Sequence, residues 1–141
     1  MDPFNLERFV TAQAPVYATA LKELQAGSKQ SHWMWFVFPQ LQGLGSSAMA
    51  QRYAISGAEE ARAYLAHPIL GHRLSECTEA VNAEHARSAF RIFGSPDDMK
   101  FHSSMTLFAA VAEDPTLFAF ALDKYFSGQR DPRTLSLLAG R

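Results

Sequence analysis

One stretch of the sequence decides the fold class: Lys29-Gln30-Ser31-His32-Trp33-Met34-Trp35-Phe36-Val37-Phe38-Pro39-Gln40. Ser31 is of a type that caps helix N-termini, and Pro39 ends any helix that precedes it. Between them, apolar side chains point in nearly every direction. Because a helix that is apolar on all sides has to be buried, the stretch predicts a central aromatic helix.

Proline placement predicts where further helices begin. An aspartate or serine precedes proline at Asp2-Pro3, Ser95-Pro96, Asp114-Pro115 and Asp131-Pro132. The fixed φ of proline suits the first helical turn, and the residue before it supplies a capping oxygen. Ser56 and Glu59 have the spacing of a capping box and predict a fifth start.

Glycines and one internal proline predict where helices end. Gly27, Gly94 and Gly128 each follow a helical pattern and can take the left-handed conformation. Pro15 divides residues 3–26 into two helices or one kinked helix. Sustained period-two alternation does not occur, so we expect an all-α protein. Residues 1–141 should form one compact domain of about seven or eight short helices around the buried aromatic helix.

Composition limits the classes of function. The chain has 141 residues, 13 basic and 14 acidic side chains, and a net charge of −1. This near-neutral balance argues against binding to nucleic acid, which needs excess basic residues to neutralise phosphates. The longest apolar run, Trp33 to Pro39, is far shorter than the roughly 20 residues of a membrane span. With no secretion signal at the N-terminus, we expect a cytoplasmic protein without membrane contact.

Cysteine and histidine usage predicts neither a metal site nor a cofactor. Cys77 is the one cysteine, and the five histidines lack ligand spacing. Glu76 and Glu79 flank Cys77 and should raise the pKa of its thiol, which argues against a nucleophilic role.

Two segments have polar residues that could form a ligand site. In the first, Lys29, His32 and Gln40 flank Trp33 and Trp35, an arrangement that could give a pocket with a flat apolar wall. His32 would lie beside Trp35 and Phe36 on one helix face. The alternative, a core helix without any site, stays open.

The second segment is Gly94–Phe108, which carries Asp98, Lys100 and Ser104. Hydroxyl groups in the middle of a predicted helix are unexpected because they compete with backbone hydrogen bonds. Asp98 and His102 are four residues apart and could pair as a base and its orienting carboxylate, or simply as surface charges.

The two segments together resemble an uncharacterised bacterial family, domain of unknown function number eighteen-ten, some members of which are mislabelled calpastatin. The resemblance covers nearly the whole chain, and its most specific motif is Ser31-His32-Trp33-Met34-Trp35-Phe36. Further matching pieces are Asp2-Pro3-Phe4, Arg8-Phe9, Phe38-Pro39-Gln40-Leu41, Gly43-Leu44-Gly45, Glu60 to Pro68, Phe93-Gly94, Pro96-Asp97-Asp98, Ser103 to Phe108, Asp131 and Thr134-Leu135. Membership implies an all-helical single domain and does not supply a reaction.

A fainter similarity reaches the small helical hydrolases that act on NAD and ADP-ribose derivatives. The order of residues agrees from Asp98 through Met105 to Leu117 and Asp131, but Ser31-His32-Trp33 replaces an expected glutamate. The similarity is a hint about substrate class.

Two hypotheses of function follow, and they leave open whether the protein is an enzyme. The first is a pocket for a nucleotide-like or ADP-ribose-like ligand, lined by Lys29, His32, Trp33, Trp35, Gln40, Lys100 and Ser104. Hydrolysis of an N-glycosidic bond there would use Asp98, or alternatively His32, as acid/base. The second is a non-enzymatic helical protein-interaction module, which would expose an apolar patch.

Overall fold

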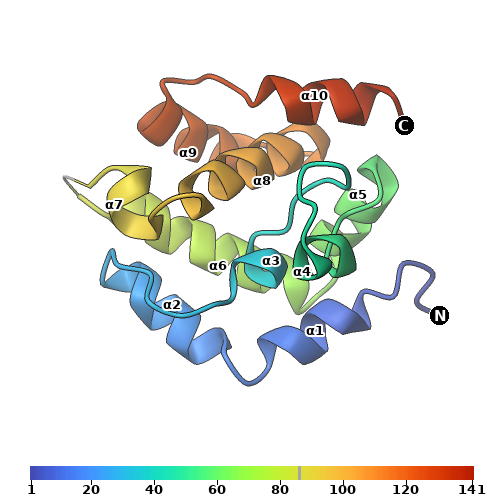
Figure 1. The fold of residues 1–141 in the computed structure, drawn as a ribbon, viewed down its shortest axis with the longest axis horizontal. Coiled ribbons are helices and arrows are strands. Elements are labelled where there is room, and N and C mark those ends of the chain that lie inside the picture. Colours follow the sequence, from blue (N-terminus) through green and yellow to red (C-terminus); the bar gives the residue numbers. More distant parts are fainter. Residues whose placement is uncertain (86) are drawn as a thin grey trace.

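The computed structural model describes residues 1–85 and 87–141, and in these it has ten α-helices and no β-strand (Figure 1). The helices are α1 Glu7–Gln13, α2 Tyr17–Gln25, α3 Met34–Val37, α4 Ala48–Arg52, α5 Ala58–Ala66, α6 Leu70–Ala83, α7 Ala89–Phe93, α8 Asp97–Val111, α9 Thr116–Phe126 and α10 Pro132–Ala139. The all-α prediction is confirmed. The number of helices is higher than expected because α3, α4 and α7 are single turns of four or five residues.

Helix α8 holds the core together. It packs against α5, α7, α9 and α10, while α6 packs against α2, α5 and α9 (Figure 1). Four large side chains of α8 are fully buried, namely Phe101, Met105, Leu107 and Phe108. These contacts enclose one hydrophobic core.

The aromatic stretch lies inside this core, as predicted. Trp33 and Phe38 have no exposed surface, and the Phe38 ring packs edge-on against Phe101 at 5.1 Å between centroids. Edge-to-face pairs of this kind add to the free energy of apolar burial. The stretch therefore joins the N-terminal helices to α8.

The helix in this stretch is shorter than the sequence suggests. It begins at Met34 with Trp33 as N-cap, so the prediction that Ser31 caps it is wrong. The Ser31 amide and hydroxyl instead donate to Glu23 of α2, 3.0 and 2.6 Å away. Because His32 precedes the helix, the predicted helical spacing between His32 and Trp35 does not hold.

The proline rule locates three helix starts closely. Helix α10 begins at Pro132 as predicted, whereas α8 and α9 begin directly after Pro96 and Pro115, which are their N-caps. The prediction that Ser95 caps α8 is therefore wrong. Asp131 caps α10 by accepting from Thr134 N at 3.1 Å.

The other two predicted starts need correction. The Asp2 carboxylate accepts from Leu6 N and Glu7 N, so α1 begins four residues after Pro3. Ser56 donates from its amide and hydroxyl to Glu60, not to Glu59. Gly57 is the N-cap of α5, which makes Glu60 the third residue of the helix, the position from which a carboxylate reaches back.

The predicted helix ends are confirmed. Gly27, Gly94 and Gly128 have φ of 70°, 74° and 75°, values that favour glycine. Pro15 lies between α1 and α2, which are separate helices.

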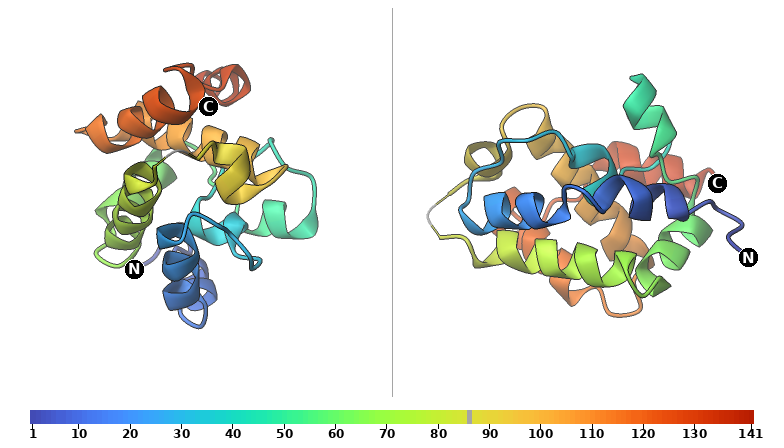
Figure 2. Two further views of the ribbon diagram at one scale, coloured as in Figure 1. Left: turned by 90° about the vertical axis from the view of Figure 1, so that its left-hand side faces the viewer. Right: turned by 90° about the horizontal axis from the view of Figure 1, so that it is seen from below.

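Residues 42–54 form a loop whose two ends are joined. Leu41 and Ile55 form an isolated parallel bridge, in which Gln42 N donates to Ile55 O at 2.8 Å and Ile55 N to Gln40 O at 2.9 Å. The loop contains α4, which has no buried residue. Figure 2 shows α4 at the edge of the molecule, standing away from the other helices.

In the chain as described, none of the helices combines the length and the apolarity that a membrane crossing requires.

Candidate functional site

Four of the predicted site residues come together around a fifth residue, Asp97 at the start of α8. The Lys29 ammonium lies 2.9 Å from Asp97 Oδ2, and the Lys100 ammonium lies 3.6 Å from Asp97 Oδ1. Each ammonium also lies over an indole ring, Lys29 over Trp33 at 5.0 Å and Lys100 over Trp35 at 5.4 Å. We call these five residues the lysine–tryptophan cluster. It contains two positive charges and one negative charge.

Lys29 is the buried member of the cluster. Its side chain is only 6% exposed, and its ammonium donates to Ser31 O at 2.5 Å as well as to Asp97. The Lys29 amide donates to Ile92 O of α7 at 2.7 Å. These contacts satisfy Lys29 inside the protein, so it holds the loop after α2 against α7 and α8.

Trp33 is held in place by Glu23 of α2. The indole N–H donates to Glu23 Oε1 at 2.9 Å, and the same carboxylate accepts from Gln30 N and from the Ser31 amide and hydroxyl. Burial alone would raise the pKa of Glu23, but these hydrogen bonds outweigh burial and lower it to about 2. Glu23 therefore stays ionised and fixes the loop that carries the cluster.

Solvent reaches the cluster at Trp35 and Lys100. Trp35 is half-buried on α3, and 23% of the Lys100 side-chain surface is exposed. Trp33, in contrast, has no exposed surface. A molecule that approaches from solvent would meet part of the Trp35 indole, the Lys100 ammonium and the Asp97 carboxylate, whose side chain is 20% exposed.

The side chains of the remaining predicted residues form no hydrogen bond or ion pair with the cluster in the part of the chain that the structure describes. His32 is exposed before α3, and Gln40 is half-buried after it. Asp98 lies in the first turn of α8, where Oδ1 accepts from Met99 N at 2.9 Å. Ser104 is fully buried in α8, and its hydroxyl lacks a hydrogen-bond partner among the described residues.

His102 makes contacts other than the pairing with Asp98 that the sequence suggested. The ring stacks on Phe126 of α9 at 4.1 Å between centroids, and Nε2 lies 2.7 Å from Gln129 O. Since a carbonyl oxygen only accepts, Nε2 carries the proton. His102 thus connects α8 to the end of α9.

Two of the unexpected hydroxyls in α8 have a structural role. Ser103 Oγ donates to Met99 O at 3.0 Å and lies 3.4 Å from Asp131 Oδ2. Thr106 Oγ1 donates to His102 O and accepts from Asp131 N at 3.0 Å. They attach the N-cap of α10 to α8.

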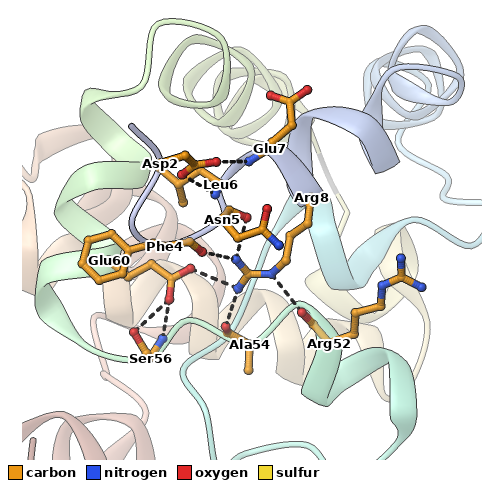
Figure 3. Close-up of polar contacts among 10 residues, drawn as sticks. All are labelled: Asp2, Phe4, Asn5, Leu6, Glu7, Arg8, Arg52, Ala54, Ser56 and Glu60. Carbon is orange, nitrogen blue, oxygen red and sulfur yellow. Dashed lines mark hydrogen bonds and ion pairs between the residues drawn. The ribbon is translucent and has the colours of Figure 1, made fainter.

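Arg8 is a residue whose role the pattern analysis missed (Figure 3). Its guanidinium donates to five oxygens: Phe4 O, Asn5 O, Arg52 O, Ala54 O and Glu60 Oε2, at 2.6 to 3.0 Å. These are all the N–H groups that an arginine has. Glu60 is 3% exposed, and its other oxygen accepts from Ser56. The group joins the N-terminal segment to α4 and α5.

The sequence contains one signal that could have predicted the role of Glu23, but no side-chain pattern that could have predicted the role of Arg8. A buried tryptophan needs an acceptor for its indole N–H, so a buried Trp33 required a partner such as a carboxylate. The partners of Arg8 are mostly backbone carbonyls, which every residue possesses. Side-chain pattern therefore could not identify them.

Three surface hollows stand out in the described part of the molecule, and none of these three is lined by a residue of the lysine–tryptophan cluster. The first, of about 460 Å³, lies between α5, α6 and the α8–α9 turn. The second lies between α2 and α6, and the third between α6 and α9. Within the described residues, no three histidine, cysteine, aspartate or glutamate side chains are grouped closely enough to hold a metal ion.

Cys77 is fully buried in α6, and burial raises the pKa of its thiol to about 12. The predicted direction of this pKa shift is confirmed. Its main cause is desolvation, whereas the sequence suggested the neighbouring carboxylates.

The comparison with known families agrees with the resemblance noted in the sequence. The model of a family described as "Protein of unknown function (DUF1810)" matches residues 3–138. The chain belongs to this DUF1810 family. A crystal structure of the conserved hypothetical protein Rv1873 from Mycobacterium tuberculosis is 59% identical, with a TM-score of 0.97 over 98% of this chain and 99% of that one. No curated protein matches the chain significantly. Neither match assigns a reaction, so function has to be argued from the residues themselves.

Proposed function

We propose that the protein binds a small nucleotide-like anion, of the ADP-ribose type, at the lysine–tryptophan cluster. The observation that carries the proposal is the pairing of Lys29 and Lys100 with one shared carboxylate, Asp97, directly over the two indoles. The Lys100 ammonium lies beside a half-exposed aromatic ring, that of Trp35. A phosphate and a planar base need this combination.

In this proposal the members of the cluster have different roles in ligand binding. Lys100 supplies the cation and Trp35 the stacking surface, because both side chains are partly exposed to solvent, as is Asp97. Lys29, Trp33 and Asp97 hold them in position. Contacts of the ligand with His32 and Gln40 stay predictions, and so does N-glycosidic hydrolysis by Asp98 or His32. Ser104 is fully buried in α8, so the proposal does not include a ligand contact there.

The binding proposal is tested by thermal shift and by tryptophan fluorescence with ADP-ribose, NAD and ADP. A ligand that binds the folded state at 100 times its Kd stabilises it by about 2.7 kcal/mol, which raises Tm. We expect Lys100→Gln and Trp35→Phe to weaken binding about ten-fold or more, since each removes one charged or stacking contact. The matched control is Lys22→Gln, at an exposed position of α2. This variant should bind the ligand as the unaltered protein does.

Absence of binding by all three compounds would exclude the nucleotide proposal. The remaining candidate would then be a protein-interaction module. Its support is the exposure of Phe90 on α7 and Met99 on α8, at 59% and 57%, on helices that pack together.

A further inference from the structure

The largest of the three hollows is separate from the lysine–tryptophan cluster and has features of its own. It is lined by residues of α5, the start of α6, the end of α8, the α8–α9 turn and α9. Its volume of about 460 Å³ falls in the range of small-molecule sites, roughly 300–1,000 Å³. We call it the α5–α8 cleft.

Apolar side chains form the floor of the α5–α8 cleft. Val111 at the end of α8 and Phe118 of α9 are 9% and 4% exposed, and half-buried Leu65 of α5 lies beside them. Such a floor favours an apolar group of the ligand, because contact removes both surfaces from water.

The rim of the cleft carries opposite charges that do not form an ion pair with each other. Arg62 of α5 contributes a guanidinium, while Glu113 and Asp114 of the α8–α9 turn contribute carboxylates. Among the described residues, Arg62 forms no ion pair, so its nitrogens lie more than 4.0 Å from either carboxylate. A bound molecule with two opposite charges could contact both sides.

Asp114 is held in a fixed position on this rim. Its Oδ1 accepts from the Thr116 amide and hydroxyl at 3.0 and 2.6 Å, which leaves Oδ2 free. The same hydrogen bonds lower the pKa of Asp114, so the carboxylate is ionised at neutral pH.

We propose that the α5–α8 cleft binds an α-amino acid with an apolar side chain. The carboxylate of the ligand pairs with Arg62, its ammonium group with Glu113 and Asp114, and its side chain packs on Val111 and Phe118. The inference does not depend on nucleotide binding at the lysine–tryptophan cluster.

The test is calorimetry and ligand-observed NMR with L-phenylalanine and L-leucine on the whole chain. L-phenylalaninamide, which lacks the carboxylate, and N-acetyl-L-phenylalanine, which lacks the ammonium group, are the chemical controls. We expect each to bind about ten-fold more weakly or worse than L-phenylalanine, because one charged contact is missing.

Two variants and one control locate the site. Arg62→Gln should weaken L-phenylalanine binding about ten-fold or more, and Ser75→Leu should abolish it by filling the cleft. Because Arg62 is exposed and Ser75 only half-buried, both substitutions should leave the core intact, which circular dichroism checks. Arg91→Gln, at an exposed arginine of α7 outside the cleft, should bind normally.

Three results would overturn the proposal. The first is no binding of either amino acid by the unaltered chain. The second is equal binding of the amide or acetyl compound, which shows that the paired charges do not select the ligand. The third is unchanged binding by both Arg62→Gln and Ser75→Leu, which places the ligand elsewhere.

Discussion

Arg8 and Glu23 show how single charged side chains organise backbone in this protein. Arg8 uses every guanidinium N–H on the segments around α1, α4 and α5 (Figure 3). Glu23 accepts four hydrogen bonds from the loop that precedes α3. Each residue thus supplies hydrogen bonds to a segment that lies outside the helices and lacks the regular backbone hydrogen bonds of secondary structure.

Replacing Arg8 with lysine should destabilise the protein although the positive charge is retained. A lysine has three donors and no planar fork, so backbone carbonyls and the 3%-exposed Glu60 would lose partners. We expect a loss of about 3 kcal/mol in the free energy of unfolding, measured with urea. Arg91→Lys at an exposed position should change it by less than about 0.5 kcal/mol. Equal stabilities of the two variants would contradict the role of the guanidinium geometry.

Glu23 should make stability depend on acid pH in a defined window. Its pKa is 4.5 when unperturbed and about 2 in the folded protein, so the folded state favours the carboxylate. The stabilisation is therefore complete above about pH 4.5 and disappears as pH falls toward 2.

Glu23→Gln should cost about 2 kcal/mol at pH 7, and the difference from the unaltered protein should vanish near pH 2. Urea titrations across this range measure it. Glu59→Gln, at an exposed residue of α5, is the control and should follow the unaltered protein throughout. A difference that stays constant with pH would show that the Glu23 charge is not responsible.

At the scale of the element, α5 and α6 approach each other closely at Gly71. A Cβ built on Gly71 would lie 2.1 Å from Leu65 O, a backbone atom that cannot turn aside. Gly71 therefore permits the sharp connection between these helices, and the wall of the α5–α8 cleft depends on it.

Gly71→Ala should destabilise the protein by about 2 to 3 kcal/mol, because the two helices have to move apart. Gly140→Ala is the matched control, since its added Cβ would have no neighbour within 3.7 Å. It should alter stability by less than about 0.5 kcal/mol. Thermal and urea unfolding compare the two, and similar losses in both would refute the steric explanation.

A helix start or end could be predicted from the sequence where the residues that cause it lie at that start or end. Prolines and glycines act through their own φ, so the starts of α8, α9 and α10 and the ends at Gly27, Gly94 and Gly128 could be predicted. The shortness of α3 could not, because Ser31 is withdrawn from capping by Glu23, eight residues earlier and on another helix. The joining of Lys29 and Lys100 through Asp97 likewise depends on the packing of the loop against α8.

At the scale of the whole molecule, Cys77 reports on the integrity of the core. It is the one cysteine of the chain, it has no exposed surface, and α6 holds it against the core cluster. Burial raises the pKa of its thiol to about 12, so almost no thiolate exists at pH 8.

Modification of Cys77 by a disulfide reagent at pH 8 should be about a thousand-fold or more slower in the native protein than in urea. Exposure requires opening of the core, which costs about 5 kcal/mol or more in a typical domain. Absorbance of the released thiolate measures the rate, and the unfolded chain should show one reactive thiol. Rapid labelling of the native protein would mean that α6 detaches without global unfolding.

The loop formed by residues 42–54 has a consequence for evolution and engineering. The Leu41–Ile55 bridge holds its ends together, and α4 within it buries no residue. Extra residues inserted here would not change the separation of the two ends, and doubling the loop would cost only about 0.6 kcal/mol in closure entropy. Length differences between homologues should therefore concentrate between residues 43 and 47, and a peptide tag spliced there should leave the core unchanged.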